Sequence, residues 1–197
     1  GVGREVYFAD FGNQRIRKLV FRGTNWFIYT VAGTGDIGNN PLCDAGCGAL
    51  TAKLSNPRAL AFASNKDLYF VDSGNKKIRK LTTSSYPDET PGNLSTFIGR
   101  SYETFGRTAT PLGDVGVLGN LFLPGHWDIR NENLVLDMVY QIAIDHNDNL
   151  WFTDSFSNRM YMAPLVNKTV ASSSSWLVNM YADNYMGRFD KAREAGA

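Results

Sequence analysis

The chain alternates between short apolar runs and short polar stretches. Runs of aromatic and β-branched residues recur along it, and clusters of Gly, Asn, Asp and Ser separate them, a pattern typical of β-strands joined by turns. No run approaches the roughly 20 apolar residues that cross a bilayer. All side chains of residues 68–71 are apolar, whereas a strand with one solvated face would alternate apolar and polar positions. We therefore expect an all-β protein whose strands are buried on both faces.

Three segments of the chain repeat one another without gaps. They cover residues 6–19, 68–81 and 150–163 and read VYFADFGNQRIRKL, LYFVDSGNKKIRKL and LWFTDSFSNRMYMA. The first two agree at most positions, and the third keeps the aromatic pair and the Asp and has an Asn one position later. Each segment predicts a strand, a tight turn and a second strand. Internal repetition of this kind indicates a repeat architecture.

The turn residues of the repeat have a structural explanation. An Asp closes the first strand, where its carboxylate can accept backbone N–H bonds from the turn. The Gly permits positive φ and the Asn tolerates it, while Phe156 in place of Gly predicts a different third turn. We assign this structural role to Asp10, Gly12, Asn13, Asp72, Gly74, Asn75, Asp154 and Asn158.

Further apolar stretches flank the hairpins. They lie before the hairpin at residues 56–62 and 141–145, and after it at residues 29–33, 95–99 and 178–182. Each unit therefore predicts four strands. Four-stranded sheets that are apolar on both faces and stack around an axis make a β-propeller.

The unit LYFVDSGNKKIRKL, preceded by NPRALAF and followed by TFIG, resembles an NHL repeat, and residues 31–60 resemble the glycine-rich connection of one NHL subgroup. The resemblance implies an all-β, NHL-type β-propeller, with roughly three four-stranded blades of a larger, six-bladed ring. The blades take residues 1–53, 54–120 and 121–197, and the third carries an insertion at 125–139. Propellers typically close with about four to eight blades, so we expect the remainder to come from further chain or from a partner. Because the chain starts at Gly1 rather than Met, we also expect any targeting signal to lie outside it.

Cys43 and Cys47 are the only cysteines, within the sequence CDAGC. At this spacing a local disulfide is feasible and would indicate an oxidising compartment, while free thiols in a cytosolic loop are the alternative. Zinc is not expected, because no second Cys or His pair supplies the remaining ligands. Asn93 and Asn167 begin N-glycosylation sequons. Both are predicted in the loop between the third and fourth strands of their blades, and they support an extracellular protein.

The sequence holds no recognisable catalytic constellation. Its only histidines, His126 and His146, have no spaced partner, and there is no nucleophile elbow, phosphate loop or zinc-protease motif. Asp10, Asp72 and Asp154 could be read as metal ligands, but their equivalent positions in the repeat favour the structural role. We therefore expect no catalytic residue, no metal, no cofactor and no enzymatic activity in this segment.

Basic side chains gather at the hairpin turns and along the strands that follow. A possible basic contact patch comprises Arg15, Arg17, Lys18, Lys76, Lys77, Arg79 and Lys80. Some NHL propellers bind RNA through a basic face, whereas charges on a solvated strand edge also prevent edge pairing. With 20 basic against 19 acidic residues, the net charge of +1 gives no overall attraction to nucleic acid. A nucleic acid partner is therefore not favoured.

The preferred hypothesis is a non-enzymatic extracellular or cell-surface module that binds protein or serves a structural role. It would belong to a larger, adhesive or filament-forming glycoprotein, with the Cys43 loop and the insertion as contact elements, because loops carry function on a rigid scaffold. One alternative is an enzyme, a propeller lyase or hydrolase, whose site lies in missing blades. Another is an intracellular RNA-binding NHL module.

Overall fold

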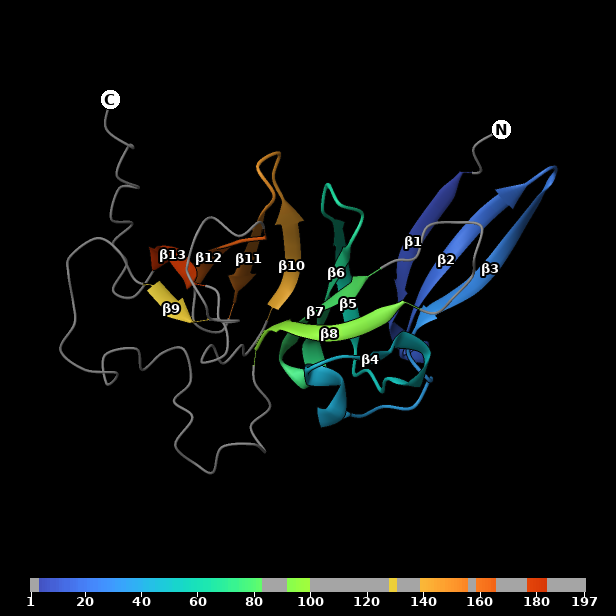
Figure 1. The fold of residues 1–197 in the computed structure, drawn as a ribbon, viewed down its shortest axis with the longest axis horizontal. Coiled ribbons are helices and arrows are strands. Elements are labelled where there is room, and N and C mark those ends of the chain that lie inside the picture. The colour runs from blue at the N-terminus through green and yellow to red at the C-terminus, as the bar shows by residue number, and fades with distance from the viewer. Residues whose placement is uncertain are drawn as a thin grey trace.

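The computed structural model describes residues 4–82, 92–99, 128–130, 139–155, 159–165 and 177–183. They form three antiparallel β-sheets that lie side by side (Figure 1). The first sheet has the order β1 (Glu5–Asp10), β2 (Arg15–Arg22), β3 (Asn25–Ala32). The described residues contain no helix long and apolar enough to cross a membrane.

The second and third sheets contain five strands each, one more than the four expected. The order in the second is β5 (Pro57–Phe62), β6 (Leu68–Asp72), β7 (Lys77–Thr82), β8 (Asn93–Ile98), β4 (Cys47–Gly48). The order in the third is β10 (Val139–Ile144), β11 (Asn149–Asp154), β12 (Arg159–Pro164), β13 (Leu177–Asp183), β9 (Asp128–Arg130). In both sheets a short strand from the preceding connection pairs with the outermost strand, at the edge that would otherwise be unpaired. The predicted insertion thus supplies β9 and the first residue of β10, and its other residues lie outside the described ones.

The turns of the first two hairpins differ from the sequence prediction in where positive φ falls. Short 3-10 helices, η1 (Phe11–Asn13) and η4 (Ser73–Asn75), connect the strands. The left-handed residues are Gln14 (φ 54°) and Lys76 (φ 56°), one position after the Asn. None of Gly12, Gly74 and the two Asn residues has positive φ, so the prediction that the turn needs it at these positions was wrong.

Close packing explains Gly74, whereas nothing comparable holds for Gly12. A Cβ atom on Gly74 would overlap the Ser55 side chain, and the Gly74 N–H donates to the Ser55 carbonyl at 2.8 Å. A Cβ on Gly12 would meet no atom within 4 Å. The same repeat position therefore needs glycine only where the connection before β5 approaches the turn.

Two apolar clusters lie between the sheets, one on each face of the middle sheet. Leu68 and Phe70 of β6 pack with residues of the first sheet, including Ile16. Tyr69 and Val71, which alternate with them, pack with residues of the third sheet, including Leu150. All of β6 is buried, which confirms the prediction of a strand apolar on both faces. Antiparallel sheets packed face to face in sequence order are compatible with a β-propeller.

Candidate functional site

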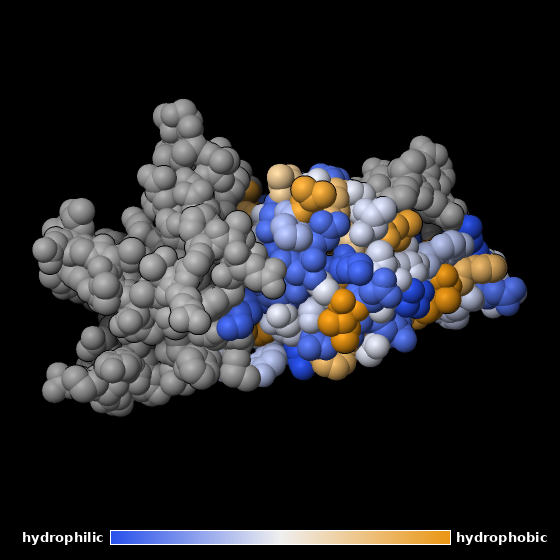
Figure 2. Space-filling model, turned by 90° about the horizontal axis from the view of Figure 1, so that it is seen from below, coloured by the Kyte–Doolittle hydropathy of each residue, from blue (hydrophilic) through white to orange (hydrophobic). Residues whose placement is uncertain are grey.

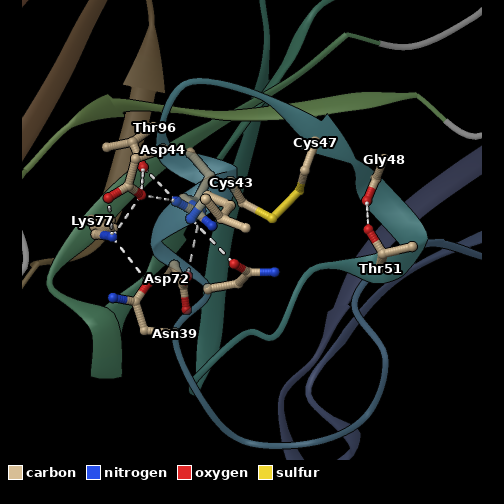
Figure 3. Close-up of a disulfide and its surroundings, with 12 residues drawn as sticks. Asn39, Cys43, Asp44, Cys47, Gly48, Thr51, Asp72, Lys77 and Thr96 are labelled. Carbon is tan, nitrogen blue, oxygen red and sulfur yellow. Dashed lines mark hydrogen bonds and ion pairs between the residues drawn. A yellow bond between two sulfur atoms is a disulfide. The ribbon is translucent and has the colours of Figure 1, made fainter.

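The connection between β3 and β5 folds into a compact loop under the middle sheet (Figure 1). It contains two short 3-10 helices, η2 (Pro41–Asp44) and η3 (Ala49–Thr51), with β4 between them. The Asn40 side chain caps η2 by accepting a bond from the Leu42 N–H at 3.2 Å. A disulfide joins Cys43 and Cys47, as the sequence predicted (Figure 3). The Asn40 cap thus fixes the start of η2, and the disulfide closes the turn that follows this helix.

Asp44 in this loop lies against two cations of β7. Its carboxylate oxygens accept bonds from Lys77 Nζ at 2.7 and 2.9 Å, and Oδ1 also accepts from Arg79 Nη1 at 2.8 Å (Figure 3). Thr96 Oγ1 of β8 donates to the same carboxylate at 2.7 Å. Lys77 and Arg79 are 0% exposed. Because water does not reach these cations, Asp44 supplies the negative charge that stabilises them.

A second carboxylate, Asp72, lies on the other side of Arg79. Asp72 Oδ2 is 3.6 Å from Arg79 Nε, and the carboxylate accepts bonds from the Ser55 N–H at 2.7 Å and the Asn75 side chain at 2.8 Å. The two acids therefore face the two cations, and the buried cluster has no net formal charge. Asp72 and Asn75 are two of the turn residues assigned a structural role, but Asp72 accepts its backbone bond from Ser55 in the preceding connection and not, as the sequence had predicted, from the turn.

The electrostatic environment shifts the pKa values of this cluster in opposite directions. Burial raises the pKa of Asp72 to about 6, although Arg79, Asn75 and the Ser55 N–H oppose this effect. For Asp44, burial also raises the pKa, but bonds from Lys77 and Thr96 and the charges of Lys77 and Arg79 outweigh it, and the net shift is downward. Asp44 is therefore the acid held in its charged form.

The first sheet repeats part of this cluster. Asp10, Arg17 and Thr30 stand at the positions of Asp72, Arg79 and Thr96, with Arg17 Nε 3.2 Å from Asp10 Oδ2 and Arg17 Nη1 2.7 Å from Thr30 Oγ1. Arg17 and Asp10 remain partly exposed. Among the described residues, no carboxylate is bonded to Arg17 as Asp44 is to Arg79.

The structure corrects the predicted basic contact patch at two of its residues. Lys77 and Arg79 are buried, because Asp44 reaches them from a loop more than 30 residues earlier in the chain. Lys18 pairs with Glu5 at 3.5 Å and Lys80 with Asp67 at 2.8 Å, so two further residues of the patch form ion pairs within the chain. Arg15 donates to the carbonyls of Asn13 and Thr34. Lys77 and Arg79 are therefore not available as contact residues, and a contact through the other basic residues stays a prediction.

The connection between β3 and β5 exposes several apolar side chains to solvent. Leu42 is 82% exposed and Ile37 is 67% exposed, and Leu50 of η3 is also exposed. Seen from below, the described residues present a largely hydrophilic surface with separate apolar groups on it (Figure 2). A rigid loop that presents large apolar side chains to water can form the centre of a protein contact.

The remaining predicted sites fall in different places. Asn93 is not in a loop as expected; it is the exposed first residue of β8, and its side-chain amide lies beside Gly46. Glycosylation there stays a prediction, and Asn167, Asn158 and His126 lie outside the described residues. Asp154 ends β11, in agreement with its expected position. Within the described ranges no three His, Cys, Asp or Glu residues are grouped for metal binding.

Asp145 organises the turn between β10 and β11, a role that sequence reasoning did not assign to it. Asp145 accepts bonds from the Asn147 N–H, the Asn149 N–H and side chain, and Trp151 Nε1, each at 2.9 Å. These bonds, led by that from Trp151, lower the pKa of Asp145. Asp148 accepts bonds from the backbone N–H and hydroxyl of Ser64, which links this turn to the middle sheet. The DHNDN stretch was the signal, and it indicates a turn rather than a catalytic group. His146 is exposed in the same turn.

Comparison with known proteins is limited to the fold. No family model matches the chain, and no curated protein matches it. The chain is similar to a putative phosphatase from Bacteroides thetaiotaomicron, with a TM-score of 0.51 and 17% sequence identity, over 89% of this chain and 32% of that one. It is also similar to virginiamycin B lyase from Staphylococcus aureus, with a TM-score of 0.35 and 15% sequence identity, over 82% of this chain and 49% of that one. The chain thus spans about a third of the length of the first protein and about half of the length of the second. The first likeness is one of fold alone, and the sheets described above show an all-β chain whose architecture is compatible with a β-propeller.

Proposed function

We propose that this chain is a set of about three NHL-type propeller blades that acts as a non-enzymatic protein-interaction module of a larger extracellular or cell-surface glycoprotein. The three repeats and the glycine-rich connection support the NHL assignment. The Cys43–Cys47 disulfide is consistent with an extracellular location. The partner contact is assigned to the connection between β3 and β5 that contains this disulfide.

The observation that carries this proposal is that the connection between β3 and β5 is fixed to the sheet and also exposes large apolar side chains. Asp44 is bonded to two buried cations and the disulfide closes the turn. Leu42 and Ile37, in the same connection, are exposed. A contact surface that is already ordered loses less conformational entropy on binding, so a small apolar patch can contribute usefully to affinity.

The alternatives receive less support from the described residues. The burial of Lys77 and Arg79 weakens the case for RNA, because affinity for a phosphate backbone comes from cations that reach the phosphates. No observation in the described residues favours an enzymatic site over a binding surface.

The test is photo-crosslinking from the loop. A benzoylphenylalanine at position 42 should crosslink to a protein in the secreted or surface fraction of the source cells, and not to a cytosolic protein or RNA. Adding Ile37→Asp should abolish the crosslink, whereas Lys53→Ala, in the exposed pair with Asp36, should not. Crosslinks to RNA or to cytosolic proteins, or crosslinks unaffected by Ile37→Asp, would contradict the proposal.

A further inference from the structure

Asn93 begins the N-glycosylation sequon Asn93-Leu94-Ser95 and is the exposed first residue of β8. It lies opposite Gly48 of β4 in register, next to the edge strand of the middle sheet. Gly48 is exposed as well, and a Cβ atom on it would meet only Thr51 Oγ1, at 3.7 Å. The acceptor residue of the sequon therefore has no bulky side chain opposite it in the strand pair.

The side-chain nitrogen of Asn93, the atom to which an N-linked sugar is attached, lies against Gly46. A Cβ atom on Gly46 would be 3.1 Å from Asn93 Nδ2 and 3.5 Å from Asn93 Oδ1, and Gly46 has a φ of 139°, which favours glycine. Any other residue at position 46 would crowd the amide that receives the sugar. Gly46 belongs to residues 43–47, which the disulfide closes into a ring and which we call the Cys43–Cys47 loop. A sugar on Asn93 therefore begins beside this loop.

An exposed apolar side chain of η3 lies close to the same position. The Ala49 N–H donates to the carbonyl of Gly92, the residue before Asn93, at 2.9 Å. Leu50, the next residue of η3, is 39% exposed. The start of β8 and the exposed side of η3 are thus adjacent.

Leu42, the most exposed apolar residue of the proposed contact, is close to Asn93 through the disulfide. The Cα atoms of Cys43 and Cys47 are 4.7 Å apart, and consecutive Cα atoms are about 3.8 Å apart, so Leu42 Cα lies within about 9 Å of Cys47 Cα. Cys47 is in turn opposite Leu94, the residue after Asn93. The sequon and the proposed contact surface are therefore neighbours in space.

We propose that Asn93 carries an N-linked glycan and that this glycan covers the Cys43–Cys47 loop, so that its presence limits the access of a protein partner to Leu42. An N-glycan is bulky and hydrophilic. With the sugar, the apolar side chains beside the loop are covered, and without it they are open to a partner. The covering of the loop does not depend on the proposed function, whereas the effect on a partner rests on it.

The first measurement is peptide mass spectrometry of the full chain secreted by eukaryotic cells. Ser95→Ala removes the sequon but keeps Asn93, and Ser95→Thr keeps the sequon, so the two variants are matched. We expect a sugar on Asn93 in the parent and in Ser95→Thr, and none in Ser95→Ala. Circular dichroism checks that both variants are folded. A parent chain secreted without a sugar on Asn93 would overturn the proposal.

Hydroxyl-radical footprinting tests the covering of the loop without any partner. Leu42 and Leu50 should be oxidised less in Ser95→Thr than in Ser95→Ala, and enzymatic removal of the glycan from Ser95→Thr should abolish this protection. Trp26 of β3, which is 51% exposed on the first sheet, is the internal control and should react equally in both variants. Equal oxidation of Leu42 and Leu50 in the two variants would overturn the covering of the loop.

The last measurement is crosslinking from benzoylphenylalanine at position 42 in both variants. Ser95→Ala should crosslink to the partner several-fold more than Ser95→Thr, because no sugar then obstructs the loop. Equal crosslinking from both variants would overturn the effect on the partner and leave the proposed function intact. No crosslink from either variant, with the sugar present and the loop protected, would contradict the proposed function and with it the effect on the partner.

Discussion

Replacing Asp44 by Asn removes one negative charge from the buried cluster and changes little else. The side chain keeps its size, but its amide group would point N–H donors at Lys77 and Arg79, which are themselves donors. Both cations are 0% exposed, and only Asp72 would remain to offset their charge. We therefore expect the free energy of unfolding to fall clearly in this variant.

The size of the effect follows from the burial of the partners. Removing one member of a buried ion pair typically costs about 3–5 kcal/mol. The Asp44 side chain is itself 34% exposed, so water compensates part of the lost interaction and we expect a loss of about 2–3 kcal/mol. For a chain of 197 residues this corresponds to a fall in Tm of roughly 5–10 °C.

The assay is urea unfolding followed by tryptophan fluorescence and circular dichroism, without reductant. Asp36→Asn is the matched control, because the pair of Asp36 with Lys53 spans 3.8 Å between side chains that are 72% and 49% exposed. Exposed pairs contribute at most about 1 kcal/mol, so this control should stay close to the parent. The reasoning is refuted if Asp44→Asn and Asp36→Asn lose the same small amount of stability.

Three further predictions concern the same region. Replacing Cys43 by Ala and Cys47 by Ser opens a loop with sequence separation 4 and should cost about 2 kcal/mol by the loop-entropy relation; addition of dithiothreitol to the parent should lower its Tm similarly, and an unchanged Tm would contradict this. Gly74→Ala should destabilise by about 1–3 kcal/mol because its Cβ overlaps Ser55, whereas Gly12→Ala should be neutral or stabilising by up to about 1 kcal/mol; calorimetry of the pair compares them, and equal shifts would refute the packing argument. The pKa of Asp72 is raised to about 6 in the folded chain, so the folded state binds the proton more tightly and this residue's contribution to stability should fall as pH rises from about 4 to about 6. Unfolding of Asp72→Asn across this range should lack that part of the slope, and an identical slope would argue against it.

The sequence by itself determined the repeat, the hairpins and the disulfide. The apolar run at residues 68–71 predicted a strand buried on both faces, because a strand with one wet face would alternate. The close spacing of Cys43 and Cys47 allowed a local bridge to be predicted without knowledge of the fold. These features depend on neighbours along the chain, and local sequence is sufficient to specify them.

The tertiary structure decided which of the repeated residues are alike in environment. Arg17 and Arg79 occupy the same repeat position, yet only Arg79 is buried, because Asp44 reaches it from a distant loop. Gly12 and Gly74 are equally matched in sequence, yet only Gly74 lies against Ser55. Burial and close approach depend on which sheet or loop lies beside a residue in space, and the sequence of a repeated motif does not specify these neighbours.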